Sequence, residues 1–412
     1  MKVFVSAGEV SGDMAGARLV ERLRRKAPDL QLYGVGGWRL ARAGVALDFA
    51  TNHLGTVGVS EAVAILPALR RAFAAIRRRV RQDPPEVAIL IANDVFNVLL
   101  GRWLRARGIP TVAYFPPQVW IWGSLARAIV PSFDLILTCF AAEQQVYERA
   151  AAGRSTTVTF VGHYLAETLK PRTTAEIAAA RAKYGVPERS RVIGLLPGSR
   201  VFELESHLPA LLRAGGELAT KLPAPVFLLP VAEDGLRERV ERELRRWPSK
   251  SSVTLVDSSH DVMRAADLLV LASGTASLEA ALLGVPMVIV YKVRRMTMLA
   301  VRLAIAAGLI DSDTVGLPNL ILGARAFPEL KQSRATVGLI VSEAASILDQ
   351  PERREGMRAA CAEVARRVAV SDSLDRAADA ILELAEARTR GASAIPPGDL
   401  TFRPVGPKEE GG

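Results

Sequence analysis

Short apolar runs that end in turns rich in small residues and continue as amphipathic helical patterns recur along this chain, and this alternation constrains its fold most strongly. The first run, Val3-Phe4-Val5, leads through a glycine-rich turn into a helical pattern over 15–26. Units of this kind build doubly wound α/β domains around a parallel sheet. Further strands are expected at 31–35, 87–91, 111–115, 135–139 and 158–161, and again at 192–196, 226–230, 253–256, 268–271 and 287–291.

The two sets of strands are separated by a polar stretch, 166–190, that carries helix and turn signals but no strand pattern. With 412 residues the chain is also too long for one ordinary core. We therefore expect a Rossmann-like N-terminal domain over 1–165 and a second one over 166–345, facing each other across a central cleft. Helices within 346–390 are expected to pack back toward the first domain, and the tail over 391–412, rich in Gly, Pro and charge, to be disordered.

The balance of charges points to an anionic partner. A formal net charge of +10 favours a phosphorylated substrate or an acidic lipid surface. No compact face combines Arg or Lys with aromatic residues, so a nucleic-acid partner is not expected. A helical pattern over 66–80 has an apolar stripe beside many arginines. It fits either a core-facing helix with a solvated basic face or a helix that lies on an anionic membrane.

Cysteine usage and the N-terminus indicate a compartment. Cys139 and Cys361 are far apart, and each stands in an apolar context, so we expect buried thiols in a reducing environment rather than a disulfide. The N-terminus enters a strand without a signal-peptide pattern, and no apolar stretch reaches membrane-spanning length. These features predict a cytoplasmic protein whose membrane contact is peripheral.

The second half carries the clearest candidate for an anion site. The apolar run 192–196 ends at Pro197-Gly198-Ser199-Arg200 and a helical pattern follows. Unpaired N–H groups at such a turn suit a diphosphate, and Arg200 can bind phosphate through two hydrogen bonds. The alternative is an ordinary turn with a surface arginine. A second small-residue loop, Ser273-Gly274-Thr275-Ala276, leads to Glu279, which could accept hydrogen bonds from a ribose-like diol. No acidic pair of the DxD type is present, so neither a metal nor another cofactor is expected.

The first half places other polar residues at strand ends. Glu9, Ser11 and Asp13 follow the first strand, where ligands bind in such folds, although Ser11 or Asp13 could simply cap the helix. Trp120, beside prolines, could line an apolar or sugar-stacking pocket. His163 could act as a base, contact a ligand or be structural.

Taken in order, these segments resemble the lipid-A-disaccharide synthases from about Val3 to Thr336. The segments that carry the resemblance are Ser6-Ala7-Gly8-Glu9-Val10-Ser11-Gly12-Asp13, Gly58 with Glu61, Pro117-Gln118-Val119-Trp120-Ile121-Trp122, Phe160-Val161-Gly162-His163, Leu196-Pro197-Gly198-Ser199-Arg200 with Glu203, Ser273-Gly274-Thr275-Ala276 with Leu278-Glu279, Pro286-Met287-Val288, Leu317-Pro318-Asn319, and Pro328-Glu329-Leu330 with Gln332.

The resemblance implies an inverting, metal-independent glycosyltransferase with the GT-B fold. Its donor would be a UDP-2,3-diacylglucosamine and its acceptor 2,3-diacylglucosamine 1-phosphate, giving the β-1,6 lipid A disaccharide 1-phosphate and UDP. Such an enzyme would work at the inner face of the inner membrane, and a homodimer is one option. The residues around the UDP would be Gly198, Ser199, Arg200, Ser273, Gly274, Thr275, Glu279 and Asn319. Those on the acceptor side would be Glu9, Ser11, Glu61, Trp120 and His163.

This chain departs from the family pattern where the catalytic base is expected. The family usually has Asp-x-Pro-Asp-Phe-Asn before this helix, but Ala92 and Val95 stand at the two aspartate positions. The base could be the neighbouring Asp94, or Glu61 or Asp13. Tyr164 also replaces a usual proline. Three alternatives stay open: a GT-B enzyme with another acceptor, a nucleotide-sugar epimerase, or a non-catalytic UDP-sugar-binding protein.

Overall fold

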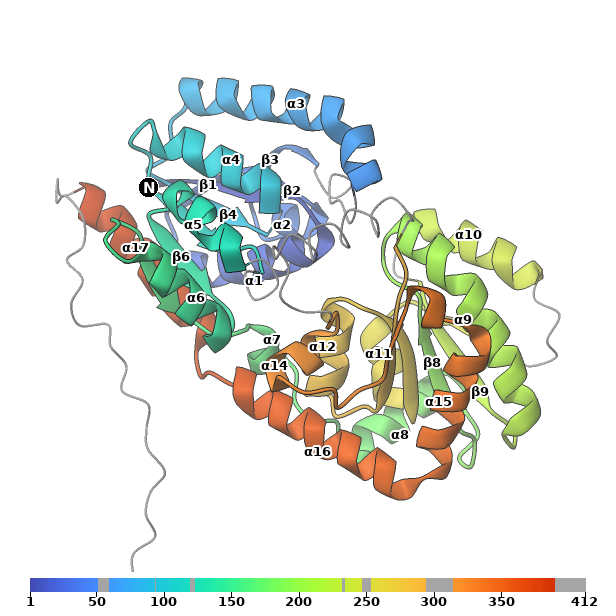
Figure 1. Cartoon of the computed structure of the whole chain (residues 1–412). Helices are drawn as coiled ribbons and strands as arrows, with labels where there is room; N and C mark the ends of the chain where they lie inside the picture. The colour runs from blue at the N-terminus through green and yellow to red at the C-terminus, as the bar shows by residue number, and fades with distance from the viewer. Residues whose placement is uncertain are drawn as a thin grey trace, which may run out of the picture.

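The computed structural model describes residues 1–50, 59–92, 94–118, 123–231, 234–246, 253–293 and 314–389. Two parallel sheets, each flanked by helices, form two lobes (Figure 1). The first sheet contains β1 (Lys2–Ala7), β2 (Gln31–Gly36), β3 (Ala46–Ala50), β4 (Val87–Ile91), β5 (Thr111–Tyr114), β6 (Leu135–Thr138) and β7 (Thr157–Phe160). The second contains β8 (Val192–Leu196), β9 (Val226–Pro230), β10 (Val253–Val256), β11 (Leu268–Ala272), β12 (Met287–Tyr291) and β13 (Glu329–Lys331).

One or more helices follow each strand of the two sheets. The first lobe has α1 (Val10–Lys26), α2 (Trp38–Arg42), α3 (Val59–Gln82), α4 (Asp94–Arg105), α5 (Ala126–Ile129) and α6 (Ala141–Ala151). The link and second lobe have α7 (Leu165–Thr168), α8 (Thr174–Lys183), α9 (Val201–Lys221), α10 (Asp234–Arg245), α11 (Ser259–Ala265), α12 (Thr275–Leu282), α14 (Leu317–Leu322) and α15 (Val337–Asp349). The last two helices are α16 (Pro351–Val368) and α17 (Ser373–Thr389).

The strand order of each sheet fixes where a ligand can bind. The orders are β3-β2-β1-β4-β5-β6-β7 and β10-β9-β8-β11-β12-β13. The direction of winding reverses between β1 and β4 in the first sheet and between β8 and β11 in the second. Loops that leave the carboxyl ends of such neighbours diverge and open a crevice. The turn over 197–200 and the loop over 273–276 are therefore adjacent.

The burial of each strand explains whether it could be predicted from the sequence. Strands β4, β5, β6, β8 and β11 are buried at every residue, as expected for strands covered by helices on both faces. Two strands were not predicted. Strand β3 lies at an edge with alternate residues exposed, and β13 is only three residues long with Glu329 and Lys331 at its ends.

Two further sequence predictions can be compared with the fold. In α3, Ile76 and Val80 are buried in the first-lobe core, so this part of the apolar stripe is core-facing. Cys139 and Cys361 are buried free thiols, as expected. None of the helices in the described ranges combines the length and hydropathy needed to cross a bilayer.

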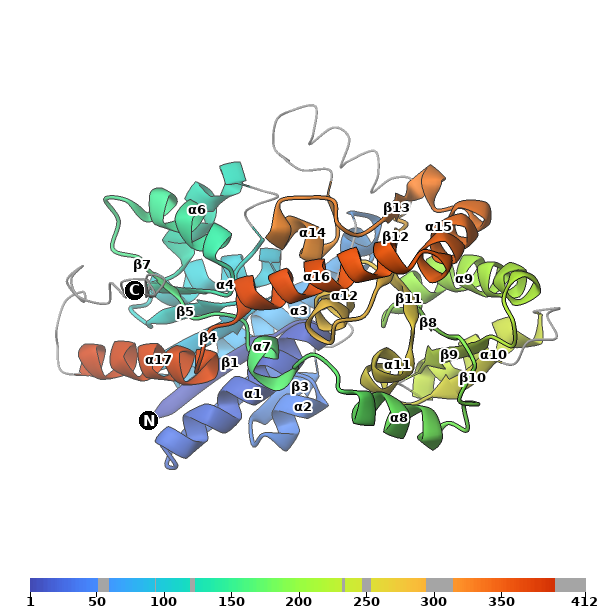
Figure 2. The same cartoon turned by 90° about the horizontal axis from the view of Figure 1, so that it is seen from below.

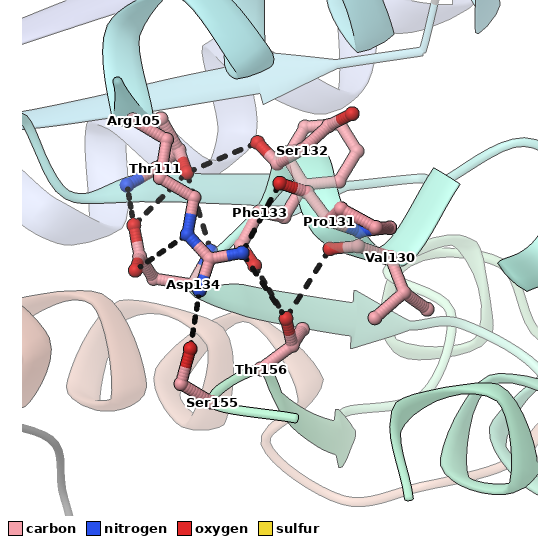
Figure 3. Close-up of polar contacts among 9 residues, drawn as sticks. All are labelled: Arg105, Thr111, Val130, Pro131, Ser132, Phe133, Asp134, Ser155 and Thr156. Carbon is pink, nitrogen blue, oxygen red and sulfur yellow. Dashed lines mark hydrogen bonds and ion pairs between the residues drawn. The ribbon is translucent and has the colours of Figure 1, made fainter. Parts of the chain in front are cut away.

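A polar cluster joins the amino ends of three strands in the first lobe (Figure 3). Arg105, at the end of α4, donates to Asp134 (3.1 Å) and to the carbonyl of Pro131 (3.1 Å). Asp134 also accepts from the backbone N–H of Thr111 (2.9 Å), and Thr156 donates to Phe133 (2.8 Å). Because this cluster lies at the edge opposite the ligand-binding loops, its role is to fix β5, β6 and β7 relative to α4.

The last two helices belong to different lobes. Helix α16 packs against α12 and α14 of the second lobe, whereas α17 lies beside α1 of the first (Figures 1 and 2). Asp375 of α17 forms ion pairs with Arg22 and Lys26 of α1. Where the chain returns, the backbone N–H of Leu374 donates to Glu167 of α7 (3.0 Å). The two crossings between the lobes are thus bonded to each other.

Candidate active site

The turn between β8 and α9 is shaped by one glycine and one carboxylate. Gly198 has φ of +113°, and a Cβ there would lie 2.5 Å from the Cβ of Glu203, so a side chain is excluded. Glu203 accepts hydrogen bonds from the backbone N–H groups of Ser199 (2.9 Å) and Arg200 (3.3 Å). The sequence-based expectation that these N–H groups are unpaired is therefore wrong, because the carboxylate of Glu203 occupies them.

Arg200 lies between the two lobes. Its guanidinium donates to Glu203 (3.1 Å) through one nitrogen and to Glu9 of the first lobe (2.5 Å) through another. Its side chain is 32% exposed and that of Glu9 is 23% exposed. The expected cation is thus at the cleft, where a bound diphosphate would compete with Glu9 for it.

His207, which the sequence analysis missed, holds this turn in place. Its Nδ1 donates to the carbonyls of Pro197 (3.1 Å) and Glu203 (2.8 Å), and its Nε2 accepts from the backbone N–H of Lys292 (3.0 Å). Burial lowers the pKa of His207 below its ordinary value. The neutral ring therefore ties the turn to the end of β12. The signal in the sequence that could have identified His207 is a polar residue among the apolar, core-facing positions of α9.

The second loop, at the start of α12, combines glycine and serine contacts. Gly274 (φ +155°) precedes the helix, and Ser277 donates to its carbonyl (2.7 Å). Ser273 donates to the carbonyl of Val315 (2.6 Å). Glu279 is 7% exposed, and one of its oxygens lies 3.5 Å from Nε2 of His260, a second histidine that the sequence analysis did not single out. Across the described ranges, no three His, Cys, Asp or Glu side chains are grouped as metal ligands would be.

Asn319 has all of its amide groups engaged within the protein. Its side chain donates to the carbonyl of Phe327 (2.9 Å) and to Glu329 (2.8 Å), and accepts from the N–H of Phe327 (3.0 Å). Glu329 also accepts from the N–H groups of Val315 (3.1 Å) and Gly316 (2.9 Å). Asn319 therefore shapes the loop at the cleft, and its amide has little capacity left for a direct contact with UDP.

A cavity of about 240 Å³ lies at the carboxyl edge of the first sheet. It is lined by residues from the loops after β1, β4, β5, β6 and β7, and by Thr275 and Leu317 of the second lobe. Glu9 and Ser11 both line it, and Ser11 donates to Glu9 (2.9 Å). The structure thus brings these two predicted residues, His163 and the α12 loop to one space between the lobes.

Asp13 faces away from this cavity. Its carboxylate is fully buried and accepts from the backbone N–H groups of Gly37 (2.8 Å), Leu40 (3.1 Å) and Arg39 (3.2 Å) at the start of α2. Both carboxylate oxygens are thus engaged by N–H groups, and Asp13 is not among the residues that line the cavity. The arrangement argues against Asp13 as the catalytic base and gives it a capping role at a helix other than its own.

The remaining predicted residues differ in how far they are described. Asp94 is the first residue of α4, at the carboxyl end of β4, and Glu61 lies in the first turn of α3, but the side chains of both lie outside the described part of the structure. Trp120 and the tail over 391–412 lie outside the described residues altogether. His163 is 2% exposed and lines the cavity.

Residues 3–380 match the protein family described as Lipid-A-disaccharide synthetase. The chain belongs to this family. A lipid-A-disaccharide synthase of Geobacter sulfurreducens is 35% identical over 384 residues, which are 93% of this chain and 97% of the relative. One from Alcanivorax borkumensis is 35% identical over 387 residues, covering 93% and 98% of the two chains. The resemblance carried by the motifs is confirmed, and it assigns the chain to a family of glycosyltransferases that form the lipid A disaccharide.

Solved structures share the two-lobed architecture. UDP-GlcNAc 2-epimerase from Neisseria meningitidis bound to UDP-GlcNAc has a TM-score of 0.65 at 14% identity, covering 93% of this chain and 100% of that one. MurG from Acinetobacter baumannii has a TM-score of 0.53 at 13% identity, covering 93% and 99%. At such identities the likeness concerns the fold alone. Together with the two parallel sheets, it confirms the predicted GT-B fold.

Proposed function

We propose that this protein is an inverting glycosyltransferase that joins UDP-2,3-diacylglucosamine to 2,3-diacylglucosamine 1-phosphate. The products are the β-1,6 lipid A disaccharide 1-phosphate and UDP. The observation that carries the proposal is the position of Arg200, which bridges the lobes at the glycine turn of a chain that matches the family over nearly its whole folded length.

The second lobe, within 166–345, is the donor side in this proposal. Arg200 and the N-terminus of α12, rather than a metal ion, stabilise the charge of the departing diphosphate. Gly198, Ser199 and the loop Ser273-Gly274-Thr275 surround the nucleotide, and Glu279 accepts from the ribose hydroxyls. Because Glu203 already occupies the N–H groups of the first turn, the contribution of that turn is the guanidinium that it positions.

The first lobe, within 1–165, is the acceptor side, and Asp94 is the base. The support for Asp94 is its place in the chain, as the first residue of α4 and two positions after Ala92, which lines the cavity. Its carboxylate takes the proton of the acceptor 6-hydroxyl while that oxygen bonds to the anomeric carbon of the donor. The bond from this carbon to UDP breaks, and its electron pair stays on the diphosphate. Glu61 is the second candidate for the base.

The substrates suggest where the protein works. Both are lipids that carry phosphate, and a chain with a net charge of +10 is attracted to anionic membranes. We place the protein in the cytoplasm, peripherally bound at the inner face of the inner membrane, with a homodimer as one state of assembly.

The direct test supplies purified protein with both acylated sugars in detergent and measures disaccharide and UDP. We expect the two products in equal amounts, and a loss of about a hundredfold or more for Arg200→Ala. Arg246→Ala, a matched removal of an exposed arginine just after α10, should retain activity. Folded protein that releases an epimerised sugar, uses only another acceptor or binds UDP without turnover would contradict the proposal and support the corresponding alternative.

A further inference from the structure

His163 stands in an aromatic cage at the acceptor-side cavity. Its ring centroid lies 4.8 Å from that of Phe115, edge to face, and 5.4 Å from that of Phe140. Tyr164 stacks on the imidazole at 5.2 Å, with the planes 20° apart, and its ring lies 5.8 Å from that of Phe115. All four residues line the cavity, and His163 itself is 2% exposed. Three aromatic rings therefore restrict the orientation of the imidazole.

The backbone selects one tautomer of this ring. The N–H of Leu165 donates to Nδ1 at 3.2 Å, so the lone pair of Nδ1 is used and the proton of a neutral ring resides on Nε2. Burial lowers the pKa of His163 to about 3, which keeps the ring neutral at every physiological pH. Within the described residues, no protein acceptor meets the Nε2–H group.

The charges around the cavity define what can accept this hydrogen bond. Glu9 and Glu143 line it, and its lining residues include no Lys or Arg. A phosphate in this space would therefore face two carboxylates, and Arg200, the cation that pairs with one of them, Glu9, is not among the lining residues. An uncharged oxygen fits better, because it accepts from Nε2–H without repulsion from those carboxylates. The volume of about 240 Å³ is below the roughly 300–1,000 Å³ that is typical of small-ligand pockets.

We propose that the Nε2–H group of His163 donates a hydrogen bond to an uncharged oxygen of the acceptor sugar, and that His163 is not the base. This inference rests on the proposed function. In the acceptor, such oxygens include the free 4-hydroxyl and the carbonyls of the 2-acylamino and 3-acyl groups. The 1-phosphate then points out of the cavity. His163 contributes to acceptor affinity and orientation, while proton transfer belongs to another residue.

The cage is supported by the returning chain. Gly162 has φ of +82°, and a Cβ there would lie 2.6 Å from Cβ of Val370, in the segment between α16 and α17. The loop after β7 is thus packed closely against residues more than two hundred positions later in the sequence. The Nε2–H group of His163 is therefore held in position before the acceptor sugar binds, and binding costs little conformational entropy at this side chain.

Two substitutions separate a donor from a base. His163→Gln retains an N–H near the position of Nε2, whereas His163→Leu keeps the volume and removes the donor. We expect the leucine variant to raise the KM for the acceptor, and weaken its binding measured by calorimetry, by about tenfold, the effect of one hydrogen bond. The glutamine variant should stay within about threefold of wild type. Thermal unfolding and UDP binding, expected to be unchanged, report that both variants are folded.

Acceptor analogues identify the bonded oxygen. One analogue lacks the 4-hydroxyl, a second lacks the acylamino carbonyl, and a third carries an ether in place of the 3-acyl ester and so lacks that carbonyl. The analogue missing the bonded oxygen should bind wild type more weakly but bind His163→Leu as well as the full acceptor does, because the two losses are not additive for groups in contact. If all three analogues lose the same affinity in the variant as in wild type, the proposal is overturned.

Nitrogen NMR of protein with labelled histidine tests the tautomer without any substrate. We expect the His163 signals to show a neutral Nε2–H ring from pH 5 to 8. Titration of this ring near pH 6.5, or a fall in kcat of about a hundredfold in both variants, would identify a base and overturn the proposal. Failure of wild type to bind the acceptor would also overturn it. Acceptor binding without turnover would leave it standing while contradicting the proposed transfer.

Discussion

Replacing Glu9 with glutamine should tighten the binding of UDP. In the unliganded protein the guanidinium of Arg200 is shared between Glu203 on its own lobe and Glu9 across the cleft. A diphosphate that binds Arg200 must displace Glu9 and also approach its negative charge. Glu9→Gln removes both costs while retaining the size of the side chain and an oxygen that can accept from Ser11.

The size of the change in UDP affinity follows from how exposed the ion pair between Glu9 and Arg200 is to solvent. The side chains are 32% and 23% exposed, so the ion pair is partly screened by water. Pairs of this kind contribute about 1 kcal/mol or less. Since about 1.4 kcal/mol corresponds to a factor of ten, the Kd for UDP should fall by about fivefold. The gain should shrink toward twofold, roughly, at high salt, because ions screen charges at the cleft.

Calorimetric titration of UDP into wild type and Glu9→Gln at low and high salt measures this gain. Glu205→Gln is the matched control, since Glu205 lies on α9 but pairs with Arg239 on the exposed surface. It removes the same charge without touching the cleft and should leave the affinity unchanged. Equal or weaker binding by Glu9→Gln, or an equal gain in the control, would refute the competition between Glu9 and the diphosphate.

Three further predictions concern the base, the scaffold and the buried histidine. Asp94→Asn should lower kcat by about a hundredfold with an unchanged Kd for UDP, and wild-type rates would reject Asp94 as the base. Arg105→Met should lower the free energy of unfolding in urea by about 2–4 kcal/mol, because it leaves Asp134 buried without its cation, whereas exposed Arg149→Met should cost less than about 0.5 kcal/mol. Below pH 6.5 the unfolded state protonates His163 and the folded state, whose pKa is about 3, does not. Acidification should therefore destabilise wild type by up to about 1.4 kcal/mol per pH unit relative to His163→Leu, and parallel pH profiles would contradict this.

The sequence predicted the sheets well because most strands are buried on both faces. Runs such as 87–91 and 268–271 are apolar throughout, and no other element explains them as simply. Strand β3 was not predicted because an edge strand needs only half of its residues to be apolar. Strand β13 was not predicted because three residues are too few to show a hydrophobic periodicity. In both cases the neighbouring strand, rather than the local sequence, decides the structure.

The candidate site was predictable in position but not in bonding. Parallel strands end at one edge of a sheet, so residues after the strands had to gather there. What the sequence could not give were partners set by the folded chain. Asp13 accepts hydrogen bonds from the start of α2, and Glu203 accepts from the N–H groups that were expected to bind phosphate. The side-chain amide of Asn319 donates to Phe327 and Glu329. The contacts of Asp13 and Asn319 depend on the path of the backbone, which no pattern of residue types encodes. Glu203 instead binds N–H groups only three and four positions before it, as in the capping box at the start of a helix.

The placement of α17 has a consequence for biosynthesis. Ala377, Ala378 and Ile381 of this helix are fully buried, yet they are translated after the entire second lobe. The first lobe emerging from the ribosome therefore exposes the apolar surface of α1 that α17 later covers. Its final stability is reached only when almost the whole polypeptide has been made. A fragment that stops before α17 should be prone to aggregation, however complete its sheet.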